Sequence, residues 1–320
     1  MSHKLVVSIR NITEEQWSSI QQTAAAYGWT AEFYADEDEA TRAAKDAEVV
    51  FADSPKFVIG SDTVRWITSP SAGVNHFTGS DAFRAKGIML SNSSGAYGVT
   101  ISEHIIMAAL TMMRFIPEYE AEIKNRKWTR GMTLKSLKNC RATLLGTGDI
   151  GTEAAKRLRG FDPERIVGVN TRGTDPEGIF DLTAPVSELD KILPETDLLI
   201  MSLPATKNTY HIMDRDKLRL LPDGAIIVNV GRGNTIDEKA LIEELKANRL
   251  RAALDVFEKE PIPEDSGLWD CPNLLITPHV SGDMFLPYTV QRIVDLFIED
   301  FERYVKGEKP LRLVDLDKGY

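Results

Sequence analysis

Cysteine is scarce in this 320-residue chain, which contains only Cys140 and Cys271. Two cysteines are too few for a disulfide framework, and the sequence has no CxxC spacing that would predict a zinc site. The five histidines include no HExxH pair, and Glu103-His104 is followed by apolar residues, so we expect no metal site. A reducing, cytoplasmic location is the default expectation for such a chain.

Long hydrophobic runs and an excess of positive charge are also lacking. The longest strongly apolar stretch, residues 105–113, is interrupted by Thr111 and falls far short of the roughly 20 residues needed to span a bilayer. The N-terminus leads into a short strand-like run and not into a signal-peptide core. Lys and Arg number 38 against 48 Asp and Glu, so the net charge is −10. We therefore expect neither nucleic acid nor a membrane as a partner.

The segments that are present predict an α/β fold. Short apolar runs alternate with helical patterns in two series, at residues 5–9, 31–34, 49–52, 66–68 and 88–91, and then at 142–145, 166–169, 198–201, 225–228, 252–255 and 274–277. A helical stretch from Thr100 to about Lys127 separates the series, and Pro117 should kink or split it. A helix from Pro287 to about Val305 closes the chain. Strands separated by helices imply βαβ units and parallel sheets.

A glycine loop stands at the start of the second series. Gly146-Thr147-Gly148-Asp149-Ile150-Gly151 has the G-x-G-x-x-G pattern, directly after one strand and directly before a helix. In that setting Gly146 permits the tight turn, Gly148 lets the backbone approach a pyrophosphate, and Gly151 lets helix and strand pack closely. The loop therefore predicts dinucleotide binding. The alternative is a plain tight turn.

The residues after the next strand bear on the choice of cofactor. A site for NAD usually has Asp or Glu there, which binds the ribose hydroxyls. Here Asn170, Thr171 and Arg172 follow the strand, so no carboxylate repels a 2′-phosphate, and Arg172 can bind one. This favours NADP(H), with NAD(H) possible. The alternative is that Arg172 is a solvated loop residue neutralised by Asp175.

Three later segments bring reactive side chains to strand ends. They contain Arg232, Glu260 and His279, and the carboxyl ends of parallel strands are where open α/β sheets bind ligands. Such a set suits reduction of a 2-oxo acid, with Arg232 binding the substrate, His279 donating a proton and a carboxylate orienting the imidazole. Each residue alone has an ordinary structural explanation, and the coincidence of all three favours catalysis.

Together these motifs resemble the D-isomer-specific 2-hydroxyacid dehydrogenase family. The resemblance covers essentially the whole chain and is carried by the glycine loop, Val230-Gly231-Arg232-Gly233, residues 255–261 and Thr277-Pro278-His279. It implies that Arg232 binds substrate, that Glu260 pairs with the acid/base His279, and that Asp255 contacts the nicotinamide amide. The family's substrate loop is matched by residues 69–75, with Ala72 and Gly73 as substrate-binding residues, and the loop flanking the adenosine by Leu203 and Pro204.

The resemblance also implies the domains and the reaction. We expect a flavodoxin-like substrate domain of residues 1–98 and 282–320, into which a Rossmann-type NAD(P)-binding domain of residues 99–281 is inserted, with a cleft between them. The expected reaction is reduction of a small 2-oxo acid to the D-2-hydroxy acid, with Asn170, Thr171 and Arg172 resembling the NADPH-preferring glyoxylate/hydroxypyruvate reductase branch. An apolar helix face starting near Ile101 would suit a homodimer contact, and Trp128 and Arg130 could serve one.

Two alternatives stay open at this stage. A non-enzymatic NAD(H)-sensing regulatory protein on the same fold could keep the Arg, Glu and His set. An enzyme of similar layout acting on formate or phosphite would need further substrate-holding groups that the sequence does not contain. Asp149 departs from the family pattern, and its carboxylate should point away from a pyrophosphate.

Overall fold

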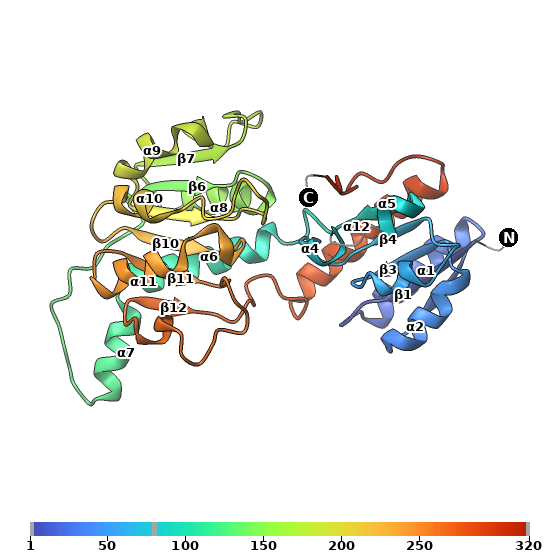
Figure 1. Ribbon diagram of the computed structural model, residues 1–320, viewed down its shortest axis with the longest axis horizontal. Coiled ribbons are helices and arrows are strands. Elements are labelled where there is room, and N and C mark those ends of the chain that lie inside the picture. The colour runs from blue at the N-terminus through green and yellow to red at the C-terminus, as the bar shows by residue number, and fades with distance from the viewer. Residues whose placement is uncertain (1–2, 79–81, 318–320) are drawn as a thin grey trace. The chain divides into compact units, whose positions relative to one another are not determined.

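The computed structural model describes residues 3–78 and 82–317 and divides into two compact units, shown in Figure 1. One unit is Met1–Tyr97 with Asp283–Tyr320, and the other is Gly98–Gly282. Both are parallel α/β folds, as the sequence predicts. The unit boundaries lie one residue from the expected positions, 98/99 and 281/282.

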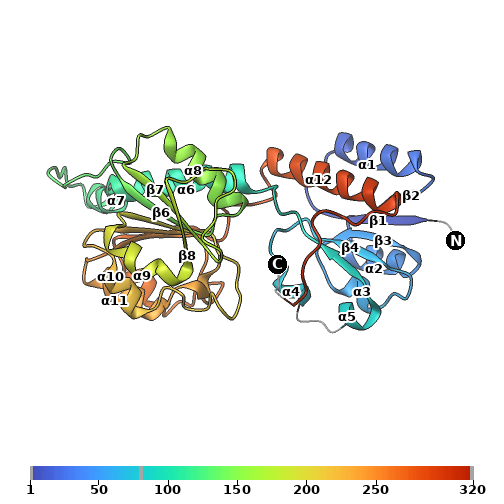
Figure 2. The same cartoon turned by 90° about the horizontal axis from the view of Figure 1, so that it is seen from above.

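The first unit is built on a five-stranded parallel sheet of order β2-β1-β3-β4-β5. Its strands are β1 Lys4–Ser8, β2 Thr30–Phe33, β3 Val49–Ala52, β4 Trp66–Thr68 and β5 Met89–Ser91. Its helices are α1 Glu14–Ala26, α2 Glu37–Ala43, α3 Lys56–Ile59, α4 Asn75–Thr78, α5 Ala82–Lys86 and α12 Pro287–Val305, with a 3₁₀ turn at Ala44–Asp46. Figure 2 shows α1 and α12 on one face of this sheet and α2 and α3 on the other.

The closing helix α12 returns to this unit because its apolar stripe completes the core. Val290, Ile293 and Val294 are buried, and Phe297 stacks on Phe51 of β3 with ring centroids 4.3 Å apart. The stripe has the 3.6-residue period of a helix with one buried face.

Helix α1 begins after the N-cap residue Thr13. Thr13 accepts a hydrogen bond from the backbone N–H of Gln16, and the Gln16 side chain accepts one from the backbone N–H of Thr13. This capping box satisfies two of the free N–H groups at a helix start. Gly28 follows the helix with φ +76°, a conformation that glycine adopts without strain.

The second unit is built on a seven-stranded parallel sheet of order β12-β11-β10-β9-β6-β7-β8. Its strands are β6 Arg141–Leu145, β7 Arg165–Asn170, β8 Leu182–Pro185, β9 Leu198–Met201, β10 Ile226–Asn229, β11 Arg251–Leu254 and β12 Leu274–Ile276. Six match predicted segments. The sequence analysis missed β8, a four-residue edge strand that pairs only with β7 and ends in proline, so it lacks the continuous apolar run of a central strand.

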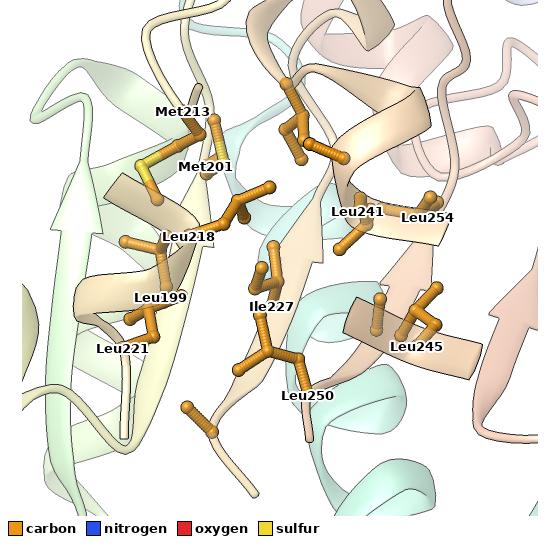
Figure 3. Close-up of a cluster of buried hydrophobic side chains, with 14 of the residues drawn as sticks. Leu199, Met201, Met213, Leu218, Leu221, Ile227, Leu241, Leu245, Leu250 and Leu254 are labelled. Atoms are coloured by element: carbon orange, nitrogen blue, oxygen red, sulfur yellow. The ribbon is translucent and has the colours of Figure 1, made fainter. Parts of the chain in front are cut away.

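Helices surround this sheet. They are α6 Gly98–Met113, α7 Ile116–Lys124, α8 Asp149–Arg159, α9 Leu189–Ile192, α10 Arg215–Leu220 and α11 Glu238–Lys246, with 3₁₀ turns at Val186–Glu188, Leu193–Glu195, Gly233–Thr235 and Gly267–Asp270. Figure 3 shows side chains of α10 and α11 packed against β9, β10 and β11, among them Leu218, Leu241, Leu199, Ile227 and Leu254. These side chains are at most 4% exposed, which explains why the strands read as continuous apolar runs.

The long predicted helix is split in two before Pro117. Helix α6 ends at Met113, Phe115 has φ 56°, and Pro117 lies in the first turn of α7. The break places the Phe115 ring 3.8 Å from the guanidinium of Arg251, which also pairs with Glu118. Across the described part of the chain, no single helix has the length and apolar composition to cross a membrane, and only α6 and α7 taken together, bent by 60°, meet that test.

Candidate active site

The glycine loop is built as a backbone cradle. Gly146 has φ +107°, and a Cβ on Gly151 would lie 2.1 Å from the Gly146 carbonyl oxygen, so helix α8 begins in close contact with the loop. A Cβ on Gly148 would meet nothing within 4 Å, and no side chain caps the N-terminus of α8 in the described residues. Open space at Gly148 and the N–H group of Ile150 in the first helical turn, which bonds to no other described residue, fit a pyrophosphate.

The carboxylate of Asp149 contacts the start of another helix, α6. It accepts a 2.8 Å hydrogen bond from the backbone N–H of Gly98, the first residue of α6. The side chain of Asp149 therefore ties the start of α8 to the start of α6.

The loop after β7 is shaped by Asn170. The Asn170 amide donates to Thr147 Oγ1 at 2.8 Å and to the Thr174 carbonyl at 2.9 Å, and its oxygen accepts from the N–H groups of Arg172 and Gly173. All of these bonds are internal, so Asn170 organises the loop. The Arg172 side chain is exposed and makes no ion pair with another described residue. The sequence alternative, an Arg172–Asp175 pair, is not formed, because Asp175 accepts from the Phe180 N–H.

Arg232, Glu260 and His279 all belong to the second unit. His279 Nδ1 lies 2.7 Å from Glu260 Oε2, and Glu260 Oε1 accepts from the Phe257 N–H at 3.0 Å. The His279 side chain is 51% exposed. Burial lowers the pKa of Arg232 and the charge of Glu260 opposes that shift, so Glu260 lies close enough to interact with the guanidinium. Arg232 forms no ion pair within the described chain; its Nη1 donates to the Gly231 carbonyl at 2.7 Å.

Asp255, at the end of β11, holds the segment that carries His279. Its carboxylate accepts hydrogen bonds from Thr277 Oγ1 at 2.6 Å and from the N–H groups of Val280 and Ser281 at 3.0 Å each. Its own carbonyl accepts from the His279 N–H. Asp255 is 1% exposed. The sequence analysis missed this bracing, and the expected contact of Asp255 with a nicotinamide amide stays a prediction.

The loops after β9 and β10 pack against each other. A Cβ on Gly231 would lie 2.6 Å from the Leu203 backbone nitrogen, so only glycine fits beside this loop. Pro204 follows in the same loop, and Val230 is 6% exposed. A cavity of about 470 Å³ continues along the loop and is lined by Ala205, Thr206, Lys207, Tyr210 and Asn234.

The expected substrate loop, residues 69–75, lies in the first unit. The N–H groups of Ala72, Gly73 and Val74 bond to no other described residue. Asp53 holds both ends of the loop, because its carboxylate accepts from the hydroxyls of Ser69 and Ser71 and lies 3.1 Å from His76 Nε2. The sequence analysis did not single out Asp53, which is distant in the sequence and carries no motif.

Comparison with known proteins decides the family. The model of the D-isomer specific 2-hydroxyacid dehydrogenase, NAD binding domain, matches residues 106–281. The chain belongs to this family. It is an oxidoreductase with a nicotinamide cofactor. Among the described residues, no group of three or more His, Cys, Asp or Glu side chains could hold a metal ion.

Individual relatives of this dehydrogenase agree with that assignment. Glyoxylate/hydroxypyruvate reductase B of Serratia proteamaculans (strain 568) is 29% identical over 286 residues, which is 87% of each chain. A solved D-isomer specific 2-hydroxyacid dehydrogenase family protein from Aeromonas salmonicida is 28% identical with a TM-score of 0.86, covering 99% of this chain and 100% of the other. The NADPH-dependent glyoxylate/hydroxypyruvate reductase of Sinorhizobium meliloti shares the fold at 24% identity and a TM-score of 0.83, over 100% of both chains.

Proposed function

We propose that this dehydrogenase reduces a small 2-oxo acid to the D-2-hydroxy acid, with NADPH preferred over NADH. The observation that carries the proposal is the 2.7 Å contact between His279 and Glu260, together with the guanidinium of Arg232, which forms no ion pair with another described residue and senses the charge of Glu260. The names of relatives support glyoxylate or hydroxypyruvate as the substrate class. A regulatory, non-enzymatic function is not favoured by these relatives.

In the proposed reaction each of the three side chains has its own task. In the protonated form of His279, Glu260 accepts the Nδ1–H, and the Nε2–H can donate a proton to the substrate oxygen. Arg232 carries its charge at neutral pH and can bind the substrate carboxylate while polarising the reacting carbonyl. The nicotinamide cofactor supplies the hydride. Ala72 and Gly73 offer N–H groups for the substrate carboxylate.

The cofactor preference rests on the loop after β7. Gly146, Gly148, Ile150 and Gly151 form the phosphate cradle, and Arg172 is the cation available to a 2′-phosphate. Asn170 contributes by holding the shape of this loop. The other proposed cofactor contacts are Thr171, Leu203, Pro204, Val230 and Asp255. The Sinorhizobium reductase is described as NADPH-dependent and holds NADP, which supports the proposal.

Of the two surfaces expected for the proposed homodimer, the α6 face that starts at Ile101 is largely buried, and the region of Trp128 is exposed. Ile101, Ile105 and Met112 of α6 are buried inside one chain, because α6 packs on α8 and the sheet. On α6 Met107 is 45% exposed, and on and after α7 Ile123 is 64% exposed and Trp128 is 85% exposed. We therefore place the dimer contact at this surface. The cytoplasmic location stays a prediction; Cys140 and Cys271 are both unpaired and buried.

The function is tested by following NADPH oxidation at 340 nm with a panel of 2-oxo acids. The His279→Ala variant should lower kcat by roughly 10²–10⁴-fold, the usual contribution of a general acid, with little change in cofactor affinity. His3→Ala is a matched control, because His3 Nδ1 also lies 2.7 Å from a glutamate, Glu48, but in the other unit. A wild-type protein that binds NADPH and oxidises it with none of the acids would contradict the proposal.

A further inference from the structure

The segment that carries His279 has an unusual backbone. His279 has φ 55°, in the left-handed region that residues with a side chain rarely adopt. Such a conformation costs free energy and persists only where neighbouring groups hold it. The surrounding hydrogen bonds therefore bear on how accurately the imidazole is presented.

Those bonds converge on Asp255 from both sides of His279. Before it, Thr277 Oγ1 donates to Asp255 Oδ1 at 2.6 Å; after it, the N–H groups of Val280 and Ser281 bond the two carboxylate oxygens at 3.0 Å. Asp255 and Ser281 are at most 5% exposed, so these bonds form away from water. Three of the lone pairs of the Asp255 carboxylate are therefore occupied by groups that flank His279.

A histidine on α6 extends this network. His104 Nε2 lies 3.4 Å from Thr277 Oγ1. The one proton of the Thr277 hydroxyl goes to Asp255, so His104 must be the donor in this contact, which requires a proton on Nε2. Burial lowers the pKa of His104, although the charge of Asp255 opposes the shift, so the neutral ring prevails at pH 7.

We propose that Thr277 and His104 are positioning residues for the acid/base His279, acting through Asp255. The chain of bonds runs from His104 on α6 to Thr277 and on to Asp255, which fixes the backbone on both sides of His279. The inference rests on the proposed function, because it matters only if His279 donates the proton. Neither Thr277 nor His104 touches the reacting atoms in this role.

The first test removes the Thr277 hydroxyl without changing the side-chain volume. Thr277→Val should lower kcat for glyoxylate reduction about tenfold, the cost of one buried hydrogen bond that acts on catalysis, and Thr277→Ser should restore most of it. KM and the Kd for NADPH should change little. The solvent isotope effect on kcat should rise, because a misplaced imidazole makes proton transfer slower.

A matched control separates this effect from the general cost of losing a buried hydroxyl. Thr143 is buried on β6 and bonds Thr196 at 2.8 Å, so Thr143→Val removes an equivalent group outside the His279 network. This variant should keep the wild-type kcat and solvent isotope effect. Equal losses in Thr143→Val and Thr277→Val would overturn the proposal, as would an effect confined to the Kd for NADPH.

The second test asks whether His104 acts through Thr277. His104→Leu should lower kcat about threefold, since the 3.4 Å bond is long, and the double variant His104→Leu/Thr277→Val should be no worse than Thr277→Val alone. Additive losses would contradict the network. If His279→Ala itself keeps wild-type turnover, the proposed function fails; if His279→Ala is inactive and Thr277→Val is unimpaired, only the positioning role fails.

Discussion

At the scale of single residues, Asn170 and Arg172 have different roles in the loop after β7, and the sequence could not distinguish these roles. Asn170 uses its amide oxygen and nitrogen for four internal hydrogen bonds, which leaves its side chain no free group for a ribose. Arg172, two residues later, is held by its backbone N–H on Asn170 while its guanidinium points into solvent unpaired with the described residues. Selectivity for a 2′-phosphate therefore depends on Arg172.

Replacing Arg172 tests this assignment. Charge-assisted hydrogen bonds to a phosphate change affinity by about tenfold or more, so Arg172→Ala should lower the ratio of kcat/KM for NADPH over NADH by that factor. Values with NADH should stay nearly constant. Arg219→Ala, on the exposed face of α10, is the control and should keep the wild-type ratio. A wild-type protein that uses NADH as well as NADPH would show that Arg172 has no such role.

At the scale of elements, the carboxylate of Asp53 contacts both ends of the loop of residues 69–75. Burial raises the pKa of Asp53, but hydrogen bonds from His76, Ser69 and Ser71 outweigh it, so the net shift is downward and the group is charged at neutral pH. The serine hydroxyls and His76 lie at opposite ends of the loop, and between them lie the N–H groups of Ala72 and Gly73, which bond to no other described residue.

Loss of that carboxylate should weaken substrate binding. Asp53→Ala removes all three contacts, and KM for the 2-oxo acid should rise about tenfold while the Kd for NADPH stays constant, because the glycine loop belongs to the other unit. The readout is steady-state kinetics with cofactor binding followed by fluorescence. Asp62→Ala, a 99% exposed carboxylate in the same unit, is the control. An unchanged KM would show that the loop holds its shape without Asp53.

At the scale of the whole molecule, ion pairs connect residues at the ends of neighbouring strands, such as β6 and β9. Arg141 on β6 bonds Asp197, just before β9, through its backbone N–H at 3.0 Å and its guanidinium at 3.0 and 2.8 Å. Burial raises the pKa of Asp197, and the bonds from Arg141 more than reverse that, so the net pKa is lowered. The folded state therefore binds this proton more weakly than the unfolded chain.

The sign of this shift predicts how stability depends on pH. A carboxyl whose pKa is lower in the folded chain stabilises the fold above its ordinary pKa, and that stabilisation is lost as the pH falls through the folded-state value. Asp197→Asn should cost about 1 kcal/mol at pH 7, since the pair is one-third exposed, and less as the pH falls below the ordinary pKa of an aspartate. Urea denaturation at several pH values measures this. A cost that does not change with pH would contradict it.

The sequence by itself determined the parts that depend on local patterns. Continuous apolar runs identified the central strands because both faces of these strands are buried, and the 3.6-residue stripe of α12 identified its buried face. Thr13, followed by Glu14 and Glu15, indicates the start of α1, because a helix cap is a contact between near neighbours. The glycine loop and the order of Arg232, Glu260 and His279 predicted the family for the same reason, since each motif is short.

Only the tertiary structure decided which residues brace those motifs. Asp53 lies 16 residues before Ser69, and His104 lies 173 residues before Thr277, so no local pattern connects either pair. The strand β8 and the burial of Ile101 escaped prediction because both depend on what the rest of the chain places beside them. Hydrogen-bond partners distant in the sequence are set by the packing of whole elements, and that packing is not encoded within any single segment.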